Sequence, residues 1–390
     1  MTEKQMEAAI NRILDRLDVI NLLYITKIAE TIQKIGELNQ SSINRMLIMA
    51  DMGADIAEIN NKLRTATKLN TADLFAVYNQ SLNDIYTDKR FAAYLQTNPL
   101  PQPRRERVSR FAQLISVQTA ERMVNISNTT SISETYRQAV DKSILAVSSG
   151  VENYKEATRQ TVRELGTNGM QVQYESGYHR RLDTAVRQNI IDGSNQLQQQ
   201  ASILIGEEIN EEVGAEVYDA FEISAHARSA PDHEPVQGRV LLKTEFEKMQ
   251  AGEDFIDVDG RMYQGFRRPI GEWNCMHIAM SFSTQHSVRR YTDKQLDDWK
   301  AANAKGCEID GKHYTTYQAV QLMRQIETAV RRQKDAAVAA KAAGDTELRQ
   351  ECQKRINALA AKYYSVANTA GITPRQDRMT VEGFRAIKVH

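Results

Sequence analysis

The sequence predicts a mainly α protein with a small central α+β module, as an elongated multi-domain helical chain. At 390 residues it is too long for one ordinary hydrophobic core. Residues 1–98 and 104–230 contain no proline, which permits long helices. Short apolar runs rich in β-branched residues begin after Gly214, mainly between 214 and 285.

Composition and charge narrow the function classes. Lys and Arg total 50, and Asp and Glu also total 50, so the net charge is zero. Proteins that coat nucleic acid usually carry a basic excess, so bulk binding is disfavoured, while local nucleic-acid contact stays open. No apolar run reaches the roughly 18 residues of a membrane span. Three scattered cysteines and a start without a signal-peptide pattern predict synthesis in a reducing cytoplasm.

Residues 1–98 predict an N-terminal helical domain. Its first helix has apolar residues at steps of three and four and ends near Gly36, with Asp15, Asp18 and Lys34 on the opposite face. The stripe consists of Met6, Ile10, Ile13, Leu17, Ile20, Tyr24, Ile28, Ile32 and Ile35. It suits a bundle core, which we favour, or a coiled-coil seam offered to a partner. Ser41 or Ser42 and then Thr71 are expected to cap further helices.

Residues 99–103, with three alternating prolines, predict an extended hinge. The arginines that follow (Arg104, Arg105, Arg107 and Arg110) suit a solvated face better than a phosphate-binding patch. Residues 104–213 predict a second helical domain. A break is expected at Gly166 and Gly169, and Gly193 weakens the long helix after it.

Residues 214–285 predict the small α+β module. Strands are expected within 215–225 and 238–242, and a helix capped by Thr244 and Glu247. Asp259-Gly260 predicts a tight hairpin.

Residues 286–370 predict a C-terminal helical hairpin region. Thr292 and Gln295 suit a capping box, Gly306 a helix stop, Asp310-Gly311 a second hairpin and Gly344-Asp345 the turn between two helices. The tail at 371–390 has no period and is expected to be extended or mobile.

Four residues form the candidate site: His226, His233, Cys275 and His277. They could bind zinc, but the His-x6-His spacing is unusual and there is no CxxC pair. Cys275 could act as a nucleophile beside a histidine, but no acidic orienting residue is marked. The interpretation we favour is a structural cluster that satisfies loop backbone in a small module. No catalytic, cofactor-binding or metal-ligating residue is therefore assigned, and zinc is the one cofactor these side chains suggest.

The stretch "SAHARSAPDHEPVQGRVL" resembles a signature of the phage minor capsid protein 2 family (Mu F-like minor head proteins). The matching residues are Ser224, His226, Arg228, Pro231, His233, Gln237, Gly238 and Val240. Arg228 lies one residue further from the proline than in the family pattern. "NCMH" resembles a later element of the family, carried here by Asn274, Cys275 and His277. Including flanking helices, the resemblance covers roughly 175–370.

The resemblance implies a structural protein of the virion, a minor capsid protein of a tailed phage or prophage made in the bacterial cytoplasm. It implies association with portal and capsid proteins, as a homo-oligomer on the portal ring, and assistance in head assembly, DNA packaging or genome delivery. Two other classes stay open: a metal-dependent or cysteine hydrolase carried in the virion, and an injected DNA-binding protein. A hydrolase would contain stoichiometric zinc or would require Cys275 for infectivity. An injected DNA-binding protein would bind DNA tightly, with an affinity that falls steeply as salt rises.

Overall fold

The structure is a computed structural model that describes residues 3–37, 42–86, 91, 101–128, 132–149, 154–174, 177–266, 268–271 and 275–388. The chain divides into two compact units. Unit 1 comprises residues 1–9, 71–121 and 188–319, and unit 2 comprises residues 10–70, 122–187 and 320–390. Each unit therefore combines segments that are far apart in the sequence.

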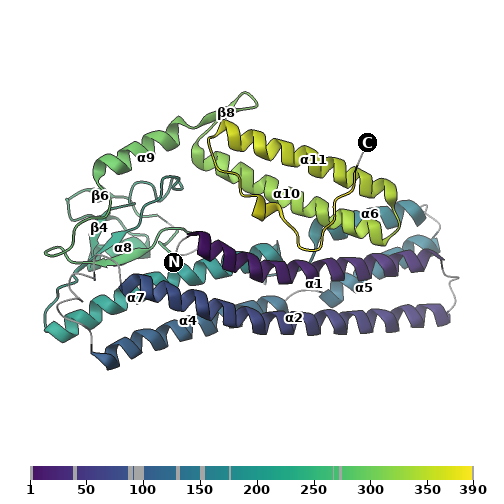
Figure 1. Cartoon of the computed structure of the whole chain (residues 1–390), viewed down its shortest axis with the longest axis horizontal. Coiled ribbons are helices and arrows are strands. Elements are labelled where there is room, and N and C mark those ends of the chain that lie inside the picture. Colours follow the sequence, from purple (N-terminus) through teal and green to yellow (C-terminus); the bar gives the residue numbers. More distant parts are fainter. Residues whose placement is uncertain are drawn as a thin grey trace. The chain divides into compact units, whose positions relative to one another are not determined.

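Helices dominate the described part of the chain, as the sequence predicts (Figure 1). They are α1 (Glu3–Glu37), α2 (Ser42–Tyr86), α4 (Gln102–Asn128), α5 (Ile132–Ser149), α6 (Tyr154–Asn168), α7 (Leu182–Val213), α8 (Lys243–Ala251), α9 (Asp293–Lys305), α10 (Thr316–Ala342) and α11 (Thr346–Thr369), with a 3-10 turn η1 (Gln376–Met379).

The strands are short and pair antiparallel. In the largest sheet β3 (Ala220–Ile223) lies between β4 (Val240–Leu242) and β7 (Ala279–Phe282). The two-stranded sheets are β1 (Gln171–Gln173) with β2 (His179–Arg181), β5 (Phe255–Ile256) with β6 (Met262–Tyr263), and β8 (Cys307–Ile309) with β9 (Lys312–Tyr314). The α+β character is thus confined to small sheets.

In unit 2 the apolar stripe of α1 is a core face of the chain itself. All stripe residues from Ile10 to Ile35 are buried. The α1 backbone also binds α5, because the Tyr136 hydroxyl donates to the Lys27 carbonyl at 3.1 Å. Lys27 forms a salt bridge with Asp55 of α2 at 3.0 Å. Residues 10–35 of α1 therefore form part of the bundle core of unit 2. Their apolar stripe is not a coiled-coil seam exposed for a partner.

The sequence places Asp18 on the face of α1 opposite the apolar stripe, and the structure shows that this position does not face solvent. Its side chain is buried and accepts a bond of 2.5 Å from Arg331 of α10. Arg331 also contacts Asp183 at 2.9 Å, and Arg181 binds the buried Asp335 at 2.7 Å. Buried charges must be paired, so these five residues form one ion cluster that joins α1, α7 and α10 within unit 2.

Two predicted helix boundaries are wrong. Thr71 lies inside α2, which continues unbroken to Tyr86. Gly166 lies inside α6, and Gly169 (φ +56°) ends it. A glycine suits position 166 because a Cβ there would lie 2.1 Å from the Cα of Ala336 on α10. Gly166 therefore permits close helix packing rather than a break.

Other local predictions have mixed outcomes. Pro103 lies in the first turn of α4, where its missing N–H costs nothing, so the extended hinge does not reach it. The start of α8 has no side-chain cap, and Thr244 lies within the helix. Thr292 does cap α9, accepting a bond from the Gln295 N–H at 3.2 Å. Ser42 begins α2, whereas Ser41 and Pro99 lie outside the described residues.

Both Asp-Gly hairpins are present. Asp310 and Gly311 have φ values of +52° and +75° and connect β8 to β9. Gly260 (φ +80°) lies between β5 and β6. Positive φ at the turn suits the right-handed strand twist, which explains the Asp-Gly signal.

Over residues 371–388 the tail packs within unit 2, where the sequence predicts an extended or mobile segment. Met379 and Val381 are buried in unit 2. Arg331 donates to the Thr380 carbonyl at 2.7 Å, and Lys334 donates to the Met379 carbonyl at 2.8 Å. The sequence does not indicate this packing, because Arg331 and Lys334 bind backbone carbonyls of the tail, and every residue has a backbone carbonyl.

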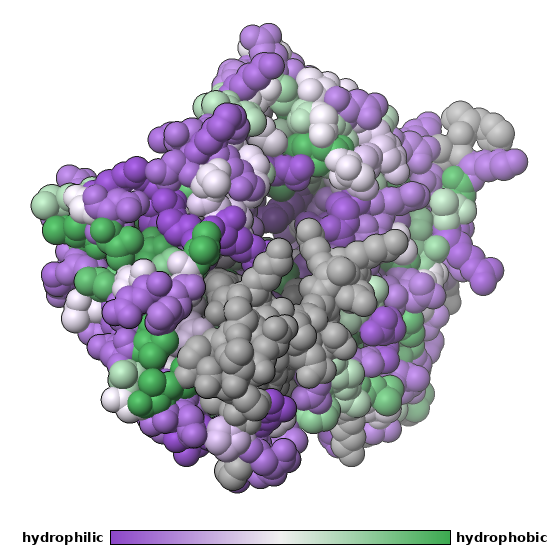
Figure 2. All heavy atoms as spheres, turned by 60° about the vertical axis from the view of Figure 1, so that its left-hand side comes forward, coloured by the Kyte–Doolittle hydropathy of each residue, from purple (hydrophilic) through white to green (hydrophobic). Residues whose placement is uncertain are grey.

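The surface in view in Figure 2 is mostly hydrophilic, with apolar side chains in separate groups. Among the described residues, no helix combines the length and the apolar character needed to cross a membrane.

Candidate functional site

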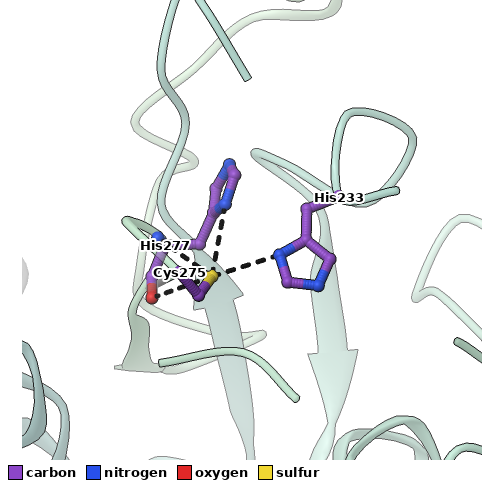
Figure 3. Close-up of side chains that lie close together, drawn as sticks. All are labelled: His233, Cys275 and His277. Atoms are coloured by element: carbon purple, nitrogen blue, oxygen red, sulfur yellow. Dashed lines mark hydrogen bonds between the residues drawn. The ribbon is translucent and has the colours of Figure 1, made fainter. Parts of the chain in front are cut away.

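In unit 1, His233, Cys275 and His277 lie together beside the β4-β3-β7 sheet (Figure 3). His233 belongs to the turn before β4, and the other two directly precede β7. The Cys275 sulfur lies 3.1 Å from Nδ1 of His233 and 3.6 Å from Nδ1 of His277. The structure therefore brings together residues 42 positions apart in the sequence, and both imidazoles present the same nitrogen to one sulfur.

The outer nitrogens of these rings have hydrogen-bond partners that favour a proton on Nε2. Nε2 of His233 lies 2.7 Å from the Arg268 carbonyl, which only accepts, so Nε2 carries the proton. Nε2 of His277 lies 3.3 Å from the Ser229 hydroxyl and 3.5 Å from Oε1 of Gln237. Donation to that amide oxygen leaves Nδ1 of His277 as an acceptor. Both rings thus direct a lone pair toward Cys275.

Burial keeps the cluster uncharged at neutral pH. The exposed fraction is 0% for His233, 1% for Cys275 and 3% for His277. Burial lowers the pKa of His233 and lowers that of His277 well below its ordinary value. Burial also raises the pKa of the Cys275 thiol. A reactive cysteine needs the opposite, a depressed pKa and partial exposure, so the geometry lends no support to a nucleophilic Cys275.

Three further motif residues, Gly238, Gln237 and Ser224, build the loops around this cluster. Gly238 has φ +68°, and its N–H bonds the Ile223 carbonyl at 2.9 Å. The Gln237 amide oxygen accepts from the His226 N–H at 3.0 Å. The Ser224 hydroxyl accepts from the Ile278 N–H at 2.9 Å. These residues hold the segment before β4 against the segment before β7.

Three motif residues lie outside the cluster. His226 directs Nε2 to the Met276 carbonyl at 2.7 Å, although its ring centroid is 4.9 Å from that of His277. Arg228 and Pro231 are exposed. A fourth, Asn274, is outside the described residues.

Sequence reasoning missed several supporting residues. Arg268 binds Asp232 through two bonds, of 2.9 and 2.8 Å, beside His233. Asn195 of α7 donates to the Cys275 carbonyl at 3.0 Å, and Gln199 accepts from the Ala279 N–H at 2.9 Å. No local pattern distinguishes these α7 amides from others on the helix, because their role depends on contacts about 80 residues away.

Asp293, at the start of α9, is the centre of a second polar arrangement in this unit. It accepts bonds from Arg289 at 2.9 Å, Arg261 at 3.0 Å and Arg239 at 2.7 Å. The bond from Arg289, followed by that from Arg261, holds the pKa of Asp293 well below its ordinary value. The Asp293 carboxylate thus links α9 to two other segments. These are the β5–β6 hairpin, through Arg261, and the residue before β4, Arg239.

Replacing Asp293 by asparagine is expected to reduce stability only where the carboxylate is charged. Its folded-state pKa lies well below the unfolded value of about 3.9, so the stabilisation is full above the unfolded value and is lost progressively as pH falls from there through the folded-state pKa. The wild-type advantage over D293N in urea unfolding should be full at about pH 6 and shrink toward about pH 3. An advantage independent of pH would contradict this assignment.

Comparison with known proteins gives one match. The family model of phage minor capsid protein 2 matches residues 1–364. No curated protein and no solved structure matches the chain. The match includes the His–Cys cluster, and it extends the 175–370 region in which the sequence resembles this family toward the N-terminus as far as residue 1, while it ends at residue 364. Because it spans nearly the whole chain, the protein belongs to the phage minor capsid protein 2 family.

Proposed function

We propose that this protein is a structural component of the virion, a portal-associated minor capsid protein of a tailed phage or prophage. The observation that carries the proposal is the family match over residues 1–364. Its partners are the portal protein and capsid proteins, on which it assembles in several copies. There it assists head assembly, DNA packaging or genome delivery.

The chemistry of unit 1 supports an architectural role. The histidine and cysteine side chains of the cluster are buried, and their backbone neighbours are bound by α7 and the adjoining loops. A site that reacts with an external substrate needs accessible groups, whereas this one holds loops together.

The arginines after Pro103 also favour a structural interpretation over DNA binding. Arg104 of α4 forms ion pairs with Glu208, Glu211 and Glu212 of α7, and Arg107 contacts Glu208 at 2.6 Å. Arginines neutralised by glutamates contribute little to phosphate binding. Arg104 and Arg107 therefore lend no support to the injected DNA-binding alternative, whereas Arg105 and Arg110 are exposed.

Co-expression with the portal protein of the same phage tests this proposal. We expect the chain to co-elute with the portal ring in gel filtration, in a fixed ratio that survives physiological salt. A chain that elutes alone at low and at physiological salt would contradict portal association. A chain that instead binds DNA tightly, with steep salt dependence, would favour the injected DNA-binding class.

A further inference from the structure

We propose that His233, Cys275 and His277 bind one zinc ion, which fastens the turn before β4 to the segment before β7. This inference does not depend on the virion role, because it concerns the chemistry of three side chains within unit 1.

The donor atoms lie close enough together for one ion to reach all three after local adjustment. Sγ of Cys275 and one nitrogen from each histidine all lie within 4.8 Å of one another. Donors at about 2.3 Å (sulfur) and 2.0–2.1 Å (nitrogen) from a tetrahedral zinc lie about 3.3–3.6 Å apart. The distances from sulfur to Nδ1, 3.1 and 3.6 Å, need only small adjustment to reach this geometry.

Hydrogen bonding alone leaves the cluster incomplete. Both histidines direct a lone pair at Cys275, since their protons are on Nε2. The thiol has a single proton and can satisfy only one of them. If the thiol proton goes to His277, Nδ1 of His233 keeps only a long contact of 3.5 Å from the Arg268 guanidinium, and if it goes to His233, Nδ1 of His277 loses its donor, which costs free energy in this buried place. A cation bound to both nitrogens and to the thiolate satisfies every group at once.

The surrounding contacts are those of metal-binding histidines. Such residues usually donate their second ring N–H to a carbonyl or carboxylate, which fixes the ring and raises its basicity. Here the Arg268 carbonyl does this for His233, and Gln237 does it for His277. The backbone N–H of His277 also points to the sulfur at 3.3 Å, which suits a thiolate.

The donor set selects the ion. One thiolate and two imidazoles suit zinc, whereas calcium and magnesium require oxygen donors. Three protein ligands leave one coordination position for water or another ligand. Binding displaces the thiol proton to solvent, so the affinity falls as pH is lowered.

Metal analysis of the full-length protein tests the proposal first. Protein folded in the presence of zinc should retain one equivalent after gel filtration, measured by inductively coupled plasma mass spectrometry. Replacement by cobalt should give a thiolate-to-cobalt charge-transfer band in the near ultraviolet. Less than a tenth of an equivalent, with no such band and no rise in Tm on adding zinc, would overturn the proposal.

Variants then locate the ion. C275S should lose the charge-transfer band, and H233A and H277A should each bind zinc at least tenfold more weakly. The matched controls are C307S and H286A, whose side chains lie outside the cluster, and both should retain one equivalent. Retention of the band by C275S would place the ion elsewhere and overturn the assignment. If a ligand variant does not fold, the wild-type cobalt spectrum and a fall in Tm on chelation decide the question instead.

Discussion

Replacing Arg331 by methionine is expected to lower the free energy of unfolding by about 3–5 kcal/mol. The guanidinium bonds Asp18 and Asp183, at 2.5 and 2.9 Å, and also donates to the Thr380 carbonyl. Methionine retains much of the side-chain volume and removes the charge. Both acids would then either stay charged without this partner or take up a proton. Urea unfolding of full-length protein measures the loss.

The adjacent Arg332 provides the matched control, because its side chain is exposed. R332M should change the free energy of unfolding by less than about 0.5 kcal/mol. Equal effects of R331M and R332M would mean that the buried ion cluster does not stabilise unit 2. The tail offers a second readout, since loss of the bond to Thr380 should speed proteolysis after residue 371 in R331M alone.

Replacing Gly166 by alanine is expected to lower the free energy of unfolding by about 1–3 kcal/mol, although alanine is the better helix former. The added Cβ would lie 2.1 Å from Cα and 2.5 Å from N of Ala336. Both are backbone atoms of α10, so relief requires that one helix move away from the other. Thermal and urea unfolding measure the change.

Gly53, in the same unit, provides the control, because replacing it by alanine should raise stability rather than lower it. It is exposed within α2, and a Cβ there meets nothing within 4 Å. G53A should therefore raise stability by about 0.5–1 kcal/mol through helix propensity alone. A stabilising effect of G166A comparable to that of G53A would contradict the close packing of α6 on α10.

Periodicity and turn chemistry predict much of this fold because they act locally. The stripe from Ile10 to Ile35 is buried as expected, since a helix places those positions on one face. Both Asp-Gly hairpins and the Thr292 cap form because neighbouring residues alone determine them. These signals establish the helical class and the small sheets.

Contacts between distant segments explain the wrong predictions. The sequence around Asp18 does not indicate that its side chain is buried, because its partner Arg331 lies 313 positions away. Gly166 resembles a helix breaker until Ala336 of α10 is placed beside it. Neither effect leaves a trace in the local sequence.

The candidate site was only half predictable. The motif identified His233, Cys275 and His277, but it also included Arg228 and Pro231, which are exposed. Spacing could not separate His226 from the cluster, because the turn at 231–238 decides which histidine faces the sulfur. The orientation of both Nδ1 atoms toward one thiol depends on the three-dimensional fold, so spacing alone does not indicate it.

The central claim is that this chain is a stoichiometric structural component of a phage head. Quantitative mass spectrometry of purified heads from the phage that encodes it tests this most directly, with portal and major capsid peptides as internal standards. The account predicts the chain in the head fraction, in a constant ratio to the portal protein across preparations. Absence of the chain from heads that contain portal and DNA would contradict it.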